Sequence, residues 1–396
     1  MTTNRLDFFR QQMAAFEATS DPKEAIKKGY YIEQPRNSLA NTIATKMILR
    51  PSSRHLLIGG IGSGKTTQLL MTYDKLNEVK DISAHYVDVS LYTDISEIKS
   101  GSLLAIAGLI FSKMLCNQEK TKEIENAINI IESYAYRTQE LEYFGINLQD
   151  NIKQYSGVLS LESTQQSIYQ KVYDSFKTIK NYISEEKIFF VLLFDGLDRF
   201  NNNQFMLNII DSDIDLISKL SIGIILVGSI SLNYSNYQDI LKQKFSNNIC
   251  YQPYFSVIND ANAYEFFDNV LKKRSPEKFI SDAARKILIT YSGGVLRDLI
   301  NLTQNSIEEA YLNDSDTIQK SHVNAAVEAY GQTKIFGVSN SELQILAKVA
   351  KGETFLPRTR EYSHLLINQM ILEYTYPKKR YAVHPVLLPL ISQPLA

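Results

Sequence analysis

The sequence of 396 residues predicts an α/β fold: a parallel sheet with helices, then a helical region and a smaller C-terminal domain. Three observations predict this order. Over residues 1–255, short apolar runs alternate with segments of helical periodicity, as expected for strands that are buried on both faces of a parallel sheet. Helical periodicity alone follows over 256–332. Over 337–396 an amphipathic helical stretch precedes two short strands.

Composition limits the class of protein. With 44% hydrophobic and 21% charged residues the chain can bury a sizeable core. Its net charge of -1 argues against a surface covered by nucleic acid, although a local basic patch remains compatible with it. Cys116 and Cys250 are the only cysteines, and the five histidines are scattered, so we expect neither a disulfide framework nor a zinc site.

The sequence also shows no targeting segment. The first twelve residues, MTTNRLDFFRQQ, lack the apolar core of a signal peptide. The longest apolar stretch, around Leu103–Leu115, is interrupted by Ser112 and Lys113 and is too short to span a bilayer. We therefore expect a cytoplasmic protein with no membrane partner.

Residues 56–70, LLIGGIGSGKTTQLL, hold the most specific motif of the chain. The segment from Gly59 to Thr66 fits G-x-x-x-x-G-K-[ST], and it lies between a predicted strand and a predicted helix, which is the context that a phosphate-binding loop requires. In such a loop the backbone N–H groups surround phosphate, Lys65 reaches the β- and γ-phosphates, and the Thr66 hydroxyl ligates Mg²⁺. The sequence therefore predicts a site for ATP and Mg²⁺. The loop residues predicted to bind the nucleotide are Gly59, Gly60, Gly62, Ser63, Gly64, Lys65, Thr66 and Thr67.

A second acidic motif follows in residues 187–200, KIFFVLLFDGLDRF. The apolar run predicts a buried strand, and Asp195 ends it at the edge where parallel α/β sheets bind ligands. This is a Walker B pattern, in which Asp195 orders Mg²⁺ and its water, although the side chain could instead cap the next turn. Asp198 could polarise the attacking water or pair with Arg199. The predicted catalytic residues are Lys65, Asp195 and Asp198.

Two further strands refine the prediction. An extra strand over 83–90, between the two motifs, resembles the additional-strand branch of P-loop ATPases. The apolar run 221–232 follows at the distance expected for the strand that carries a polar residue near the γ-phosphate. Ser229 and Ser231 are the candidates for this first sensor, and ordinary turn chemistry is the alternative for both.

Residues 291–310, YSGGVLRDLINLTQNSIEEA, resemble the second-sensor region of AAA+ ATPases, closest to the origin-recognition and replication-initiator branch and to STAND signalling ATPases. The resemblance implies that Gly293 and Gly294 form a turn and that Arg297 folds over the nucleotide. A solvated arginine at a helix start is the alternative.

Residues 30–48, YYIEQPRNSLANTIATKMI, resemble the segment that packs beside the adenine in these families. The resemblance implies that Tyr31, Ile32 and Arg36 line the base pocket.

The C-terminal segment 337–396 resembles the winged helix that is appended to the same branch. Such a domain binds duplex DNA through phosphate contacts from its second helix and its wing. A domain that contacts proteins, with a solvated basic turn, is the alternative. The candidate phosphate contacts are Arg358, Arg360, Lys378, Lys379 and Arg380, and the candidate base-edge readers are Ser363, His364, Asn368 and Gln369.

The resemblance implies three domains, and the sequence differs from the pattern of the family in two respects. The domains are an ATPase core over 1–255, a helical lid over 256–332 and a winged helix over 337–396. Lys65 and Asp195 are 130 residues apart (195 − 65), and we expect the excess, about 117–165, to form a helical insertion that binds a partner or is merely solvated. Residues 233–248, where ring-forming relatives carry an arginine finger, contain no arginine. A finger supplies several powers of ten in rate, so this favours a switch over a fast motor.

The sequence thus favours an AAA+/STAND-type ATPase whose nucleotide state controls assembly on DNA or activation of a protein effector, with a homo-oligomer as a further possible partner. Small bacterial ATPases of this layout are typical of mobile elements and anti-phage systems. Two alternatives remain: a replication-initiator-like DNA-binding protein in which ATP is structural, and a STAND-like signalling scaffold that binds proteins only.

Replacing the two acidic residues separately distinguishes their predicted roles. We expect Asp195→Asn to reduce Mg²⁺-dependent ATP hydrolysis severely, because the carboxylate orders the metal. We expect Asp198→Asn to retain ATP binding and to accumulate an ATP-bound state. Steady-state hydrolysis and nucleotide-binding titrations check both. Hydrolysis at the wild-type rate in Asp198→Asn would contradict its role as the group that polarises water.

Overall fold

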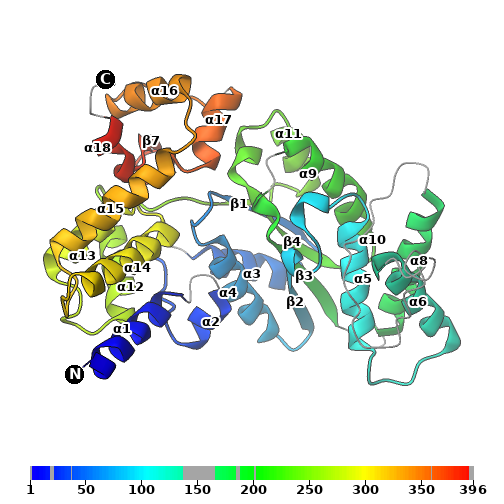
Figure 1. The fold of residues 1–396 in the computed structure, drawn as a ribbon. Helices are drawn as coiled ribbons and strands as arrows, with labels where there is room; N and C mark the ends of the chain where they lie inside the picture. Colours follow the sequence, from blue (N-terminus) through cyan, green and yellow to red (C-terminus); the bar gives the residue numbers. More distant parts are fainter. Residues whose placement is uncertain are drawn as a thin grey trace, which may run out of the picture. The chain divides into compact units, whose positions relative to one another are not determined.

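The computed structural model describes residues 2–17, 22–36, 38–136, 166–183, 188–199, 202–357 and 359–391 (Figure 1). The chain forms two compact units. The first, which we call the terminal unit, contains both chain ends and the phosphate loop: Met1–Leu39, Ile58–Leu70 and Tyr251–Ala396. The second, the sheet unit, consists of Ala40–Leu57 and Met71–Cys250.

A five-stranded sheet has the order β2-β3-β4-β1-β5. Strands β2, β3 and β4 are parallel neighbours, and β4 separates β3 from β1, the strand that leads into the phosphate loop. This is the strand order of an additional-strand P-loop ATPase, so the predicted fold class is confirmed. The strands are β1 (Arg54–Gly59), β2 (Ile82–Asp88), β3 (Phe189–Asp195), β4 (Gly223–Ser229) and β5 (Ile249–Gln252).

The central strands are buried on both faces, which explains their apolar sequences. All residues of β4 are buried, and in β3 only Phe189 is exposed. Side chains that alternate between two covered faces must all be apolar. The helices around this part of the chain are α3 (Leu39–Leu49), α4 (Lys65–Asn77), α9 (Asn203–Ile209), α10 (Asp215–Lys219) and α11 (Gln238–Lys244).

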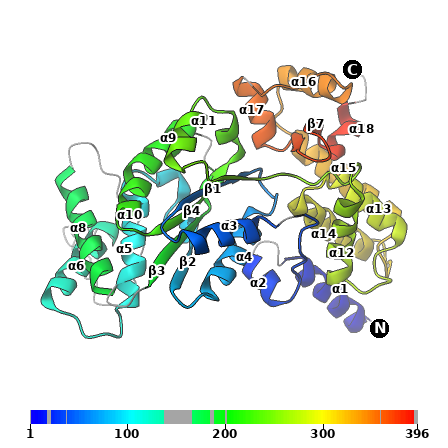
Figure 2. The same ribbon diagram turned by 180° about the vertical axis from the view of Figure 1, so that it is seen from behind.

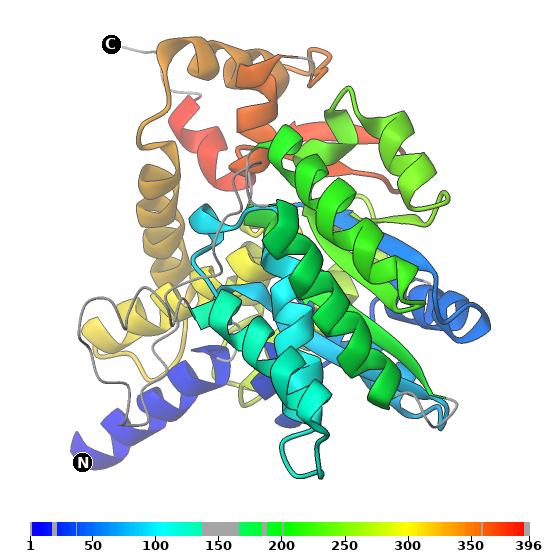
Figure 3. The ribbon, with the colours of Figure 1, turned by 90° about the vertical axis from the view of Figure 1, so that its right-hand side faces the viewer.

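Three helices form the part of the sheet unit that contains the predicted insertion: α5 (Ser102–Met114), α6 (Lys122–Tyr136) and α8 (Gln166–Ile183). They lie side by side (Figure 3). Phe111 of α5 contacts Phe176 of α8 and Phe190 of β3, with ring centroids 5.1 and 4.9 Å apart, so α5 joins the helices to the sheet. The first part of the predicted insertion is thus helical, whereas 137–165 lie outside the described residues.

A buried carboxylate holds the start of α5. Asp213 is fully buried in a π-helical turn, Ile210–Ile214. It accepts hydrogen bonds from the backbone N–H groups of Gly101, Leu103 and Leu104 at 2.6, 2.8 and 3.3 Å. Burial raises the pKa of Asp213, and the hydrogen bonds from Ser212 and from this backbone oppose that rise. The carboxylate therefore caps a helix end that has no access to water.

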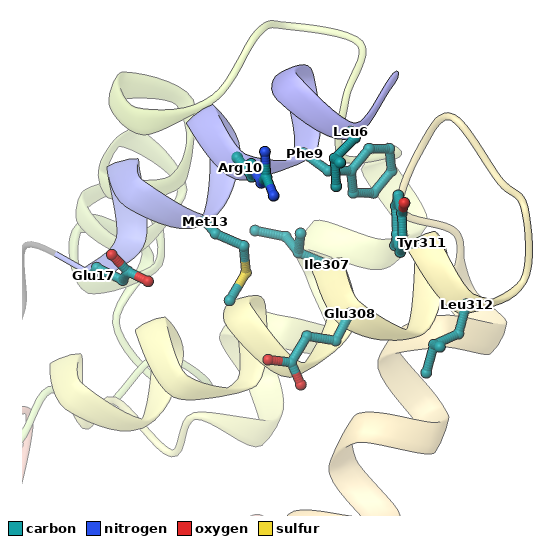
Figure 4. Close-up of a pocket in the computed structure, with 9 residues that line it drawn as sticks. All are labelled: Leu6, Phe9, Arg10, Met13, Glu17, Ile307, Glu308, Tyr311 and Leu312. Carbon is teal, nitrogen blue, oxygen red and sulfur yellow. The ribbon is translucent and has the colours of Figure 1, made fainter. Parts of the chain in front are cut away.

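In the terminal unit, four helices pack together: α12 (Ala261–Arg274), α13 (Asp282–Tyr291), α14 (Leu296–Leu312) and α15 (Lys320–Ile335). The N-terminal helix α1 (Thr2–Glu17) lies along α14 and leaves an apolar hollow, where Phe9 and Met13 face Ile307 and Tyr311 (Figure 4). Arg5 holds α1 against α14, because it donates hydrogen bonds to backbone carbonyls at the end of α14. Its guanidinium also lies over the ring of Tyr311. A shorter helix, α2 (Pro22–Lys27), follows α1.

The C-terminal segment begins after α15 with two helices and continues as an antiparallel hairpin and a final helix (Figure 2). The predicted turn YPKKR connects the two strands. These elements match the predicted helices and strands, while the winged-helix assignment and the three domain boundaries stay predictions. The elements are α16 (Asn340–Ala350), α17 (Arg360–Ile367), β6 (Ile371–Tyr374), β7 (Arg380–Val383) and α18 (Leu388–Ile391). None of the helices described is both long and apolar enough to cross a membrane.

The cap on α5 can be tested by removing it. We expect Asp213→Ala to destabilise the sheet unit by about 3 kcal/mol, because it leaves several buried N–H groups without a hydrogen-bond acceptor. Amide exchange at Ser102–Leu104 should accelerate and thermal unfolding should begin earlier. Asp239→Ala is the matched control, because Asp239 has a side chain that is 98% exposed. Equal stability of the two variants would contradict the capping role.

Candidate functional site

The phosphate loop connects the end of β1 to the start of α4 in the geometry that its motif predicts. Lys65, the first residue of α4, is only 4% exposed. Its Nζ donates to the carbonyls of Gly59 at 3.0 Å and Gly60 at 2.7 Å, so the side chain folds back along the loop. Gly62 and Gly64 have φ angles of +72° and +97°, which lie in the region that favours glycine. The glycines of the motif therefore form the turn that brings N–H groups and the ammonium to one place.

Other segments of the terminal unit approach this loop closely. A β-carbon on Gly60 would collide with the hydroxyl group of Tyr254. A β-carbon on Gly62 would lie 2.8 Å from Cβ of Arg297 and 3.1 Å from Cγ1 of Val295. Arg297 is in the first turn of α14 with an exposed side chain, beside the loop. The predicted second-sensor arginine and the phosphate loop are thus neighbours.

The turn before α14 has the predicted form. Gly293 and Gly294 have φ angles of +61° and +76°. A side chain on Gly294 would collide with the carbonyl of Phe255, and the carbonyl of Gly293 accepts a hydrogen bond of 2.7 Å from Tyr374. The glycines therefore allow the chain to turn tightly into α14 against its neighbours.

A pocket lies directly beside the phosphate loop. Gly64 and Thr67 line it together with two of the predicted base-pocket residues, Tyr31 and Ile32. Burial raises the pKa of the Tyr31 phenol, and a hydrogen bond with Gln68 partly offsets this. The phenol is therefore neutral at physiological pH. The other lining residues are Pro22, Ala25, Ile26, Tyr30, Gln34, Gln68, Phe266, Val270, Arg274 and Leu296.

Arg274 is the charged residue among the several lining residues of this pocket that the sequence did not indicate. Its guanidinium lies over the ring of Tyr30, 5.0 Å from the centroid, and donates to the carbonyl of Tyr30 at 3.3 Å. Burial lowers the pKa of Arg274 to about 10, so it still carries its charge at physiological pH. Nothing in the run KKR distinguishes Arg274 from the two lysines before it, because only the folded helix α12 turns it inward.

The third predicted base-pocket residue, Arg36, is placed elsewhere. It forms an ion pair of 2.8 Å with Asp260, the residue that caps α12. Its guanidinium also lies over the ring of Tyr376. The expectation that Arg36 lines the pocket is therefore corrected: it joins the chain before α3 to the start of α12 and to the hairpin turn.

In the sheet unit, Asp195 is 4% exposed at the end of β3. Tyr86 of β2 donates to Oδ2 at 2.9 Å, and the N–H of Gly196 donates to Oδ1 at 2.8 Å. These bonds fix the orientation of the carboxylate. Tyr86 was not predicted, although its place on the strand beside β3 follows once the two strands are paired. Asp198 lies in the short 3₁₀ turn Leu197–Arg199 and is partly exposed.

The two sensor candidates at the end of β4 are both buried. Ser229 caps the next 3₁₀ turn by accepting from the N–H of Ser231 at 3.2 Å. The hydroxyl of Ser231 donates to Asn203 at 2.7 Å. These contacts are the turn chemistry that was the alternative for both serines, and the sensor role of Ser229 stays a prediction.

The basic residues of the C-terminal segment divide into three groups. Arg358 lies outside the described residues, and Arg360 begins α17, with only its backbone described. Lys378 is exposed in the hairpin turn. Lys379 pairs with buried Glu373 at 3.0 Å, and Arg380 donates to Ser256 at 2.8 Å. Lys379 and Arg380, two of the candidate phosphate contacts, thus have partners within the chain, and their contact with DNA stays a prediction.

The candidate base-edge readers are also partly engaged. His364 lies 2.6 Å from Glu342, and Asn368 lies 2.6 Å from the other ring nitrogen of His364. Gln369 is 8% exposed and donates to the backbone carbonyl of Ile61 in the phosphate loop. Gln369 is therefore removed from the set of possible DNA contacts, whereas Ser363 is partly exposed on α17.

These residues fit a nucleoside triphosphate with Mg²⁺. The loop presents a lysine and a helix N-terminus to phosphate, and the pocket beside it presents apolar and aromatic side chains to a base. Thr66 follows Lys65 at the start of α4 and is a partly exposed residue, and the motif assigns its hydroxyl to Mg²⁺. Over the described part of the chain, no group of three or more His, Cys, Asp or Glu residues could hold a metal ion by itself.

The strand order and the phosphate loop together define an additional-strand P-loop fold. No protein-family model matches the sequence, and no curated protein matches it. Among solved structures the chain is similar to Cdc6p from Pyrobaculum aerophilum, with 14% identity, a TM-score of 0.45, and coverage of 89% of this chain and 92% of that one.

Two other solved structures are also similar, with comparable coverage and lower TM-scores. The Orc1 protein of Aeropyrum pernix, solved in complex with DNA, has 12% identity and a TM-score of 0.44, covering 91% of this chain and 93% of that one. The RuvB Holliday junction branch migration motor of Thermotoga maritima has 15% identity and a TM-score of 0.38, covering 88% and 92%. At these scores the similarity is distant, so the assignment of the fold rests on the strand order and the loop.

Proposed function

We propose that the protein is an ATP-binding and ATP-hydrolysing regulator of the AAA+/STAND type, acting in the bacterial cytoplasm. The observation that carries this proposal is the shared pocket of the terminal unit: Gly64 and Thr67 of the phosphate loop line it together with Tyr31, Ile32 and Leu296. A phosphate-binding loop beside an aromatic and aliphatic pocket supports one ligand with both a phosphate chain and a base.

The contacts of Lys65 support the phosphate end of this site. Its ammonium contacts two neutral carbonyls within the loop. The β- and γ-phosphates of ATP would replace these with charge-assisted hydrogen bonds, which are about twice as strong as neutral ones. Arg297, beside Gly62, supplies a second cation next to the loop.

For hydrolysis we assign Mg²⁺ to Thr66 and Asp195 and the polarisation of water to Asp198, following the Walker motifs. The hydrogen bonds from Tyr86 and Gly196 support the first assignment, because they fix the orientation of the Asp195 carboxylate that would hold the metal. Residues 233–248 contain no arginine, so we expect slow turnover that a partner can stimulate.

The output of the ATP state would be assembly on duplex DNA or activation of a protein effector, in a mobile-element or anti-phage system, with a homo-oligomer as one possible form. Helix α14 supports such an output, because its first turn lies beside the loop while its remaining length packs against α15. Two alternatives remain: structural ATP in an initiator-like DNA-binding protein, and a scaffold that binds proteins only. Measured ATP turnover distinguishes our proposal from the first alternative, in which ATP is structural. Binding to duplex DNA distinguishes it from the second alternative, in which the protein binds proteins only.

Removing the charge of Lys65 tests the site. We expect Lys65→Met, which keeps the aliphatic chain that the buried position needs, to weaken ATP binding by at least about 30-fold, through the loss of charge-assisted hydrogen bonds. Isothermal titration with ATP and Mg²⁺ measures this, and thermal unfolding checks the fold. Lys351→Ala removes an exposed cation at the end of α16 and should bind as the wild type does. Unchanged affinity in Lys65→Met would refute the nucleotide site.

Salt-dependent binding to labelled duplex DNA tests the DNA output. Lys379 and Arg380 are held by neighbouring residues, so we expect Lys378 to be the main phosphate contact of the turn. Lys378→Ala should then reduce the slope of log affinity against log salt by about one, with ATP present. Lys351→Ala again serves as the control for a loss of one surface charge. Identical salt slopes for Lys378→Ala and Lys351→Ala would contradict the DNA contact and favour a C-terminal segment that binds proteins.

A further inference from the structure

One backbone carbonyl in the middle of the phosphate loop receives hydrogen bonds from two side chains. Tyr254 donates its hydroxyl to the carbonyl of Ile61 at 3.0 Å, and Gln369 donates Nε2 to the same oxygen. The two donor groups are 3.2 Å apart. Tyr254 is 3% exposed and Gln369 is 8% exposed, so water competes little for this carbonyl.

Holding this carbonyl also fixes the direction of a neighbouring donor. A peptide group is planar and trans, so the C=O of Ile61 and the N–H of Gly62 point in opposite directions. With the carbonyl turned toward Tyr254 and Gln369, the N–H of Gly62 points away from them. N–H groups of successive loop residues are the ligands of phosphate in a loop of this type. The two side chains therefore set the orientation of a phosphate-binding donor.

Gln369 is itself held at both ends of its amide. It lies between α17 and β6 with a φ angle of +58°, which glutamine rarely adopts. While its Nε2 donates to the loop, its Oε1 accepts from Nζ of Lys334 at 3.4 Å. Strained backbone that the surrounding structure holds in place is typical of functional positions. The donor end of the amide thus faces Ile61 because a cation of α15 occupies the acceptor end.

Lys334 connects this contact to the helix of the second sensor. Its Nζ donates to Asp298 at 3.2 Å, and Asp298 follows Arg297 in α14. His384, in the C-terminal segment, lies 2.9 Å from the same carboxylate oxygen. Burial alone would raise the pKa of Asp298, but the nearby imidazole of His384 and the charge of Lys334 lower it to about 2. The carboxylate of Asp298 therefore links α14, α15 and the C-terminal segment through Lys334, the same residue that contacts Gln369.

We propose that Gln369 is a positioning residue of the ATP site, which orients the Ile61–Gly62 peptide for phosphate and couples phosphate binding to the C-terminal segment. This rests on the proposed function. Coupling of this kind is reciprocal: a segment that favours the phosphate-binding form of the loop is itself stabilised when phosphate binds. The proposed route from nucleotide to output thus includes a direct contact between the loop and Gln369, in the segment between α17 and the hairpin, in addition to α14.

Two variants remove the side chain in different ways. Gln369→Leu keeps most of the buried volume and removes both polar ends. Gln369→Gly removes the side chain and relieves the backbone, because glycine adopts a positive φ without cost. A defect that both variants share cannot arise from backbone strain. Asn368→Ala is the matched control, since Asn368 precedes Gln369, is exposed and contacts His364.

The first measurement is amide hydrogen exchange in the ligand-free proteins. We expect peptides that cover 60–66 to exchange faster in both Gln369 variants than in the wild type and in Asn368→Ala. The second is titration with ATP and Mg²⁺, in which both variants should bind about tenfold more weakly, the loss expected when one buried hydrogen bond no longer orients the loop. In the third, ATP should slow exchange over Ile371–Tyr374 in the wild type and not in the Gln369 variants.

The outcomes separate this inference from the proposed function. Loop exchange and ATP affinity that match the wild type in both Gln369 variants would overturn the positioning role and leave the ATP site intact. Weaker ATP binding with unchanged exchange over Ile371–Tyr374 in every protein would overturn the coupling. A wild-type protein that binds no ATP would overturn the proposed function itself.

Discussion

The backbone of the phosphate loop can be approached closely only because it carries glycine. Tyr254 reaches Gly60, and the first turn of α14 reaches Gly62, at separations that a β-carbon would prevent. The glycines that leave backbone N–H groups accessible to phosphate therefore also allow Tyr254 and α14 to pack closely against the loop. Binding of the ligand and contact with the rest of the terminal unit depend on one structural property, the absence of side chains at these positions.

Three buried carboxylates, those of Asp195, Asp213 and Asp298, are each fixed by more than one partner. Asp195 accepts hydrogen bonds from Tyr86 and Gly196, and Asp213 accepts three from the start of α5. Asp298 is shared by Lys334 and His384. An unsatisfied buried carboxylate costs several kcal/mol, so these arrangements resist change. Rigid carboxylates of this kind suit parts that must hold position while the ligand exchanges.

Local patterns in the sequence were sufficient to predict the loop, most of the strands and most of the helices, whereas the short edge strand β5 was not predicted. The phosphate loop and the strand that ends at Asp195 are defined by contiguous residues, and burial on both faces gives β3 and β4 their apolar runs. Helical periodicity predicted α12 and α14, because the buried side chains of a helix recur at a regular spacing in contiguous residues. These features depend on neighbours in the chain, and the sequence shows such neighbours directly.

The partners of long polar side chains could not be predicted in this way. Arg36 pairs with Asp260, which is 224 residues away, and Gln369 bonds Ile61 across 308 residues. The cations of the turn YPKKR look equivalent in sequence, yet a buried glutamate holds Lys379. In each case the side chain was expected to meet solvent or ligand, and the folded chain instead supplies a partner that no spacing rule indicates.

The contrast between these two kinds of residue bears on how the ATP site can be regulated. A glycine motif specifies where phosphate binds, but it does not specify the state of the loop, because a flexible backbone has several conformations. Tyr254 and Gln369 select among them through one carbonyl, and they come from different parts of the terminal unit. The positive φ of Gln369 costs free energy, which the hydrogen bonds of its side-chain amide with Ile61 and Lys334 help to offset. In the ATP site that we propose, phosphate binding would thus depend on the loop together with the segment that carries Gln369, and a partner that displaces this segment would change ATP affinity without contacting the nucleotide.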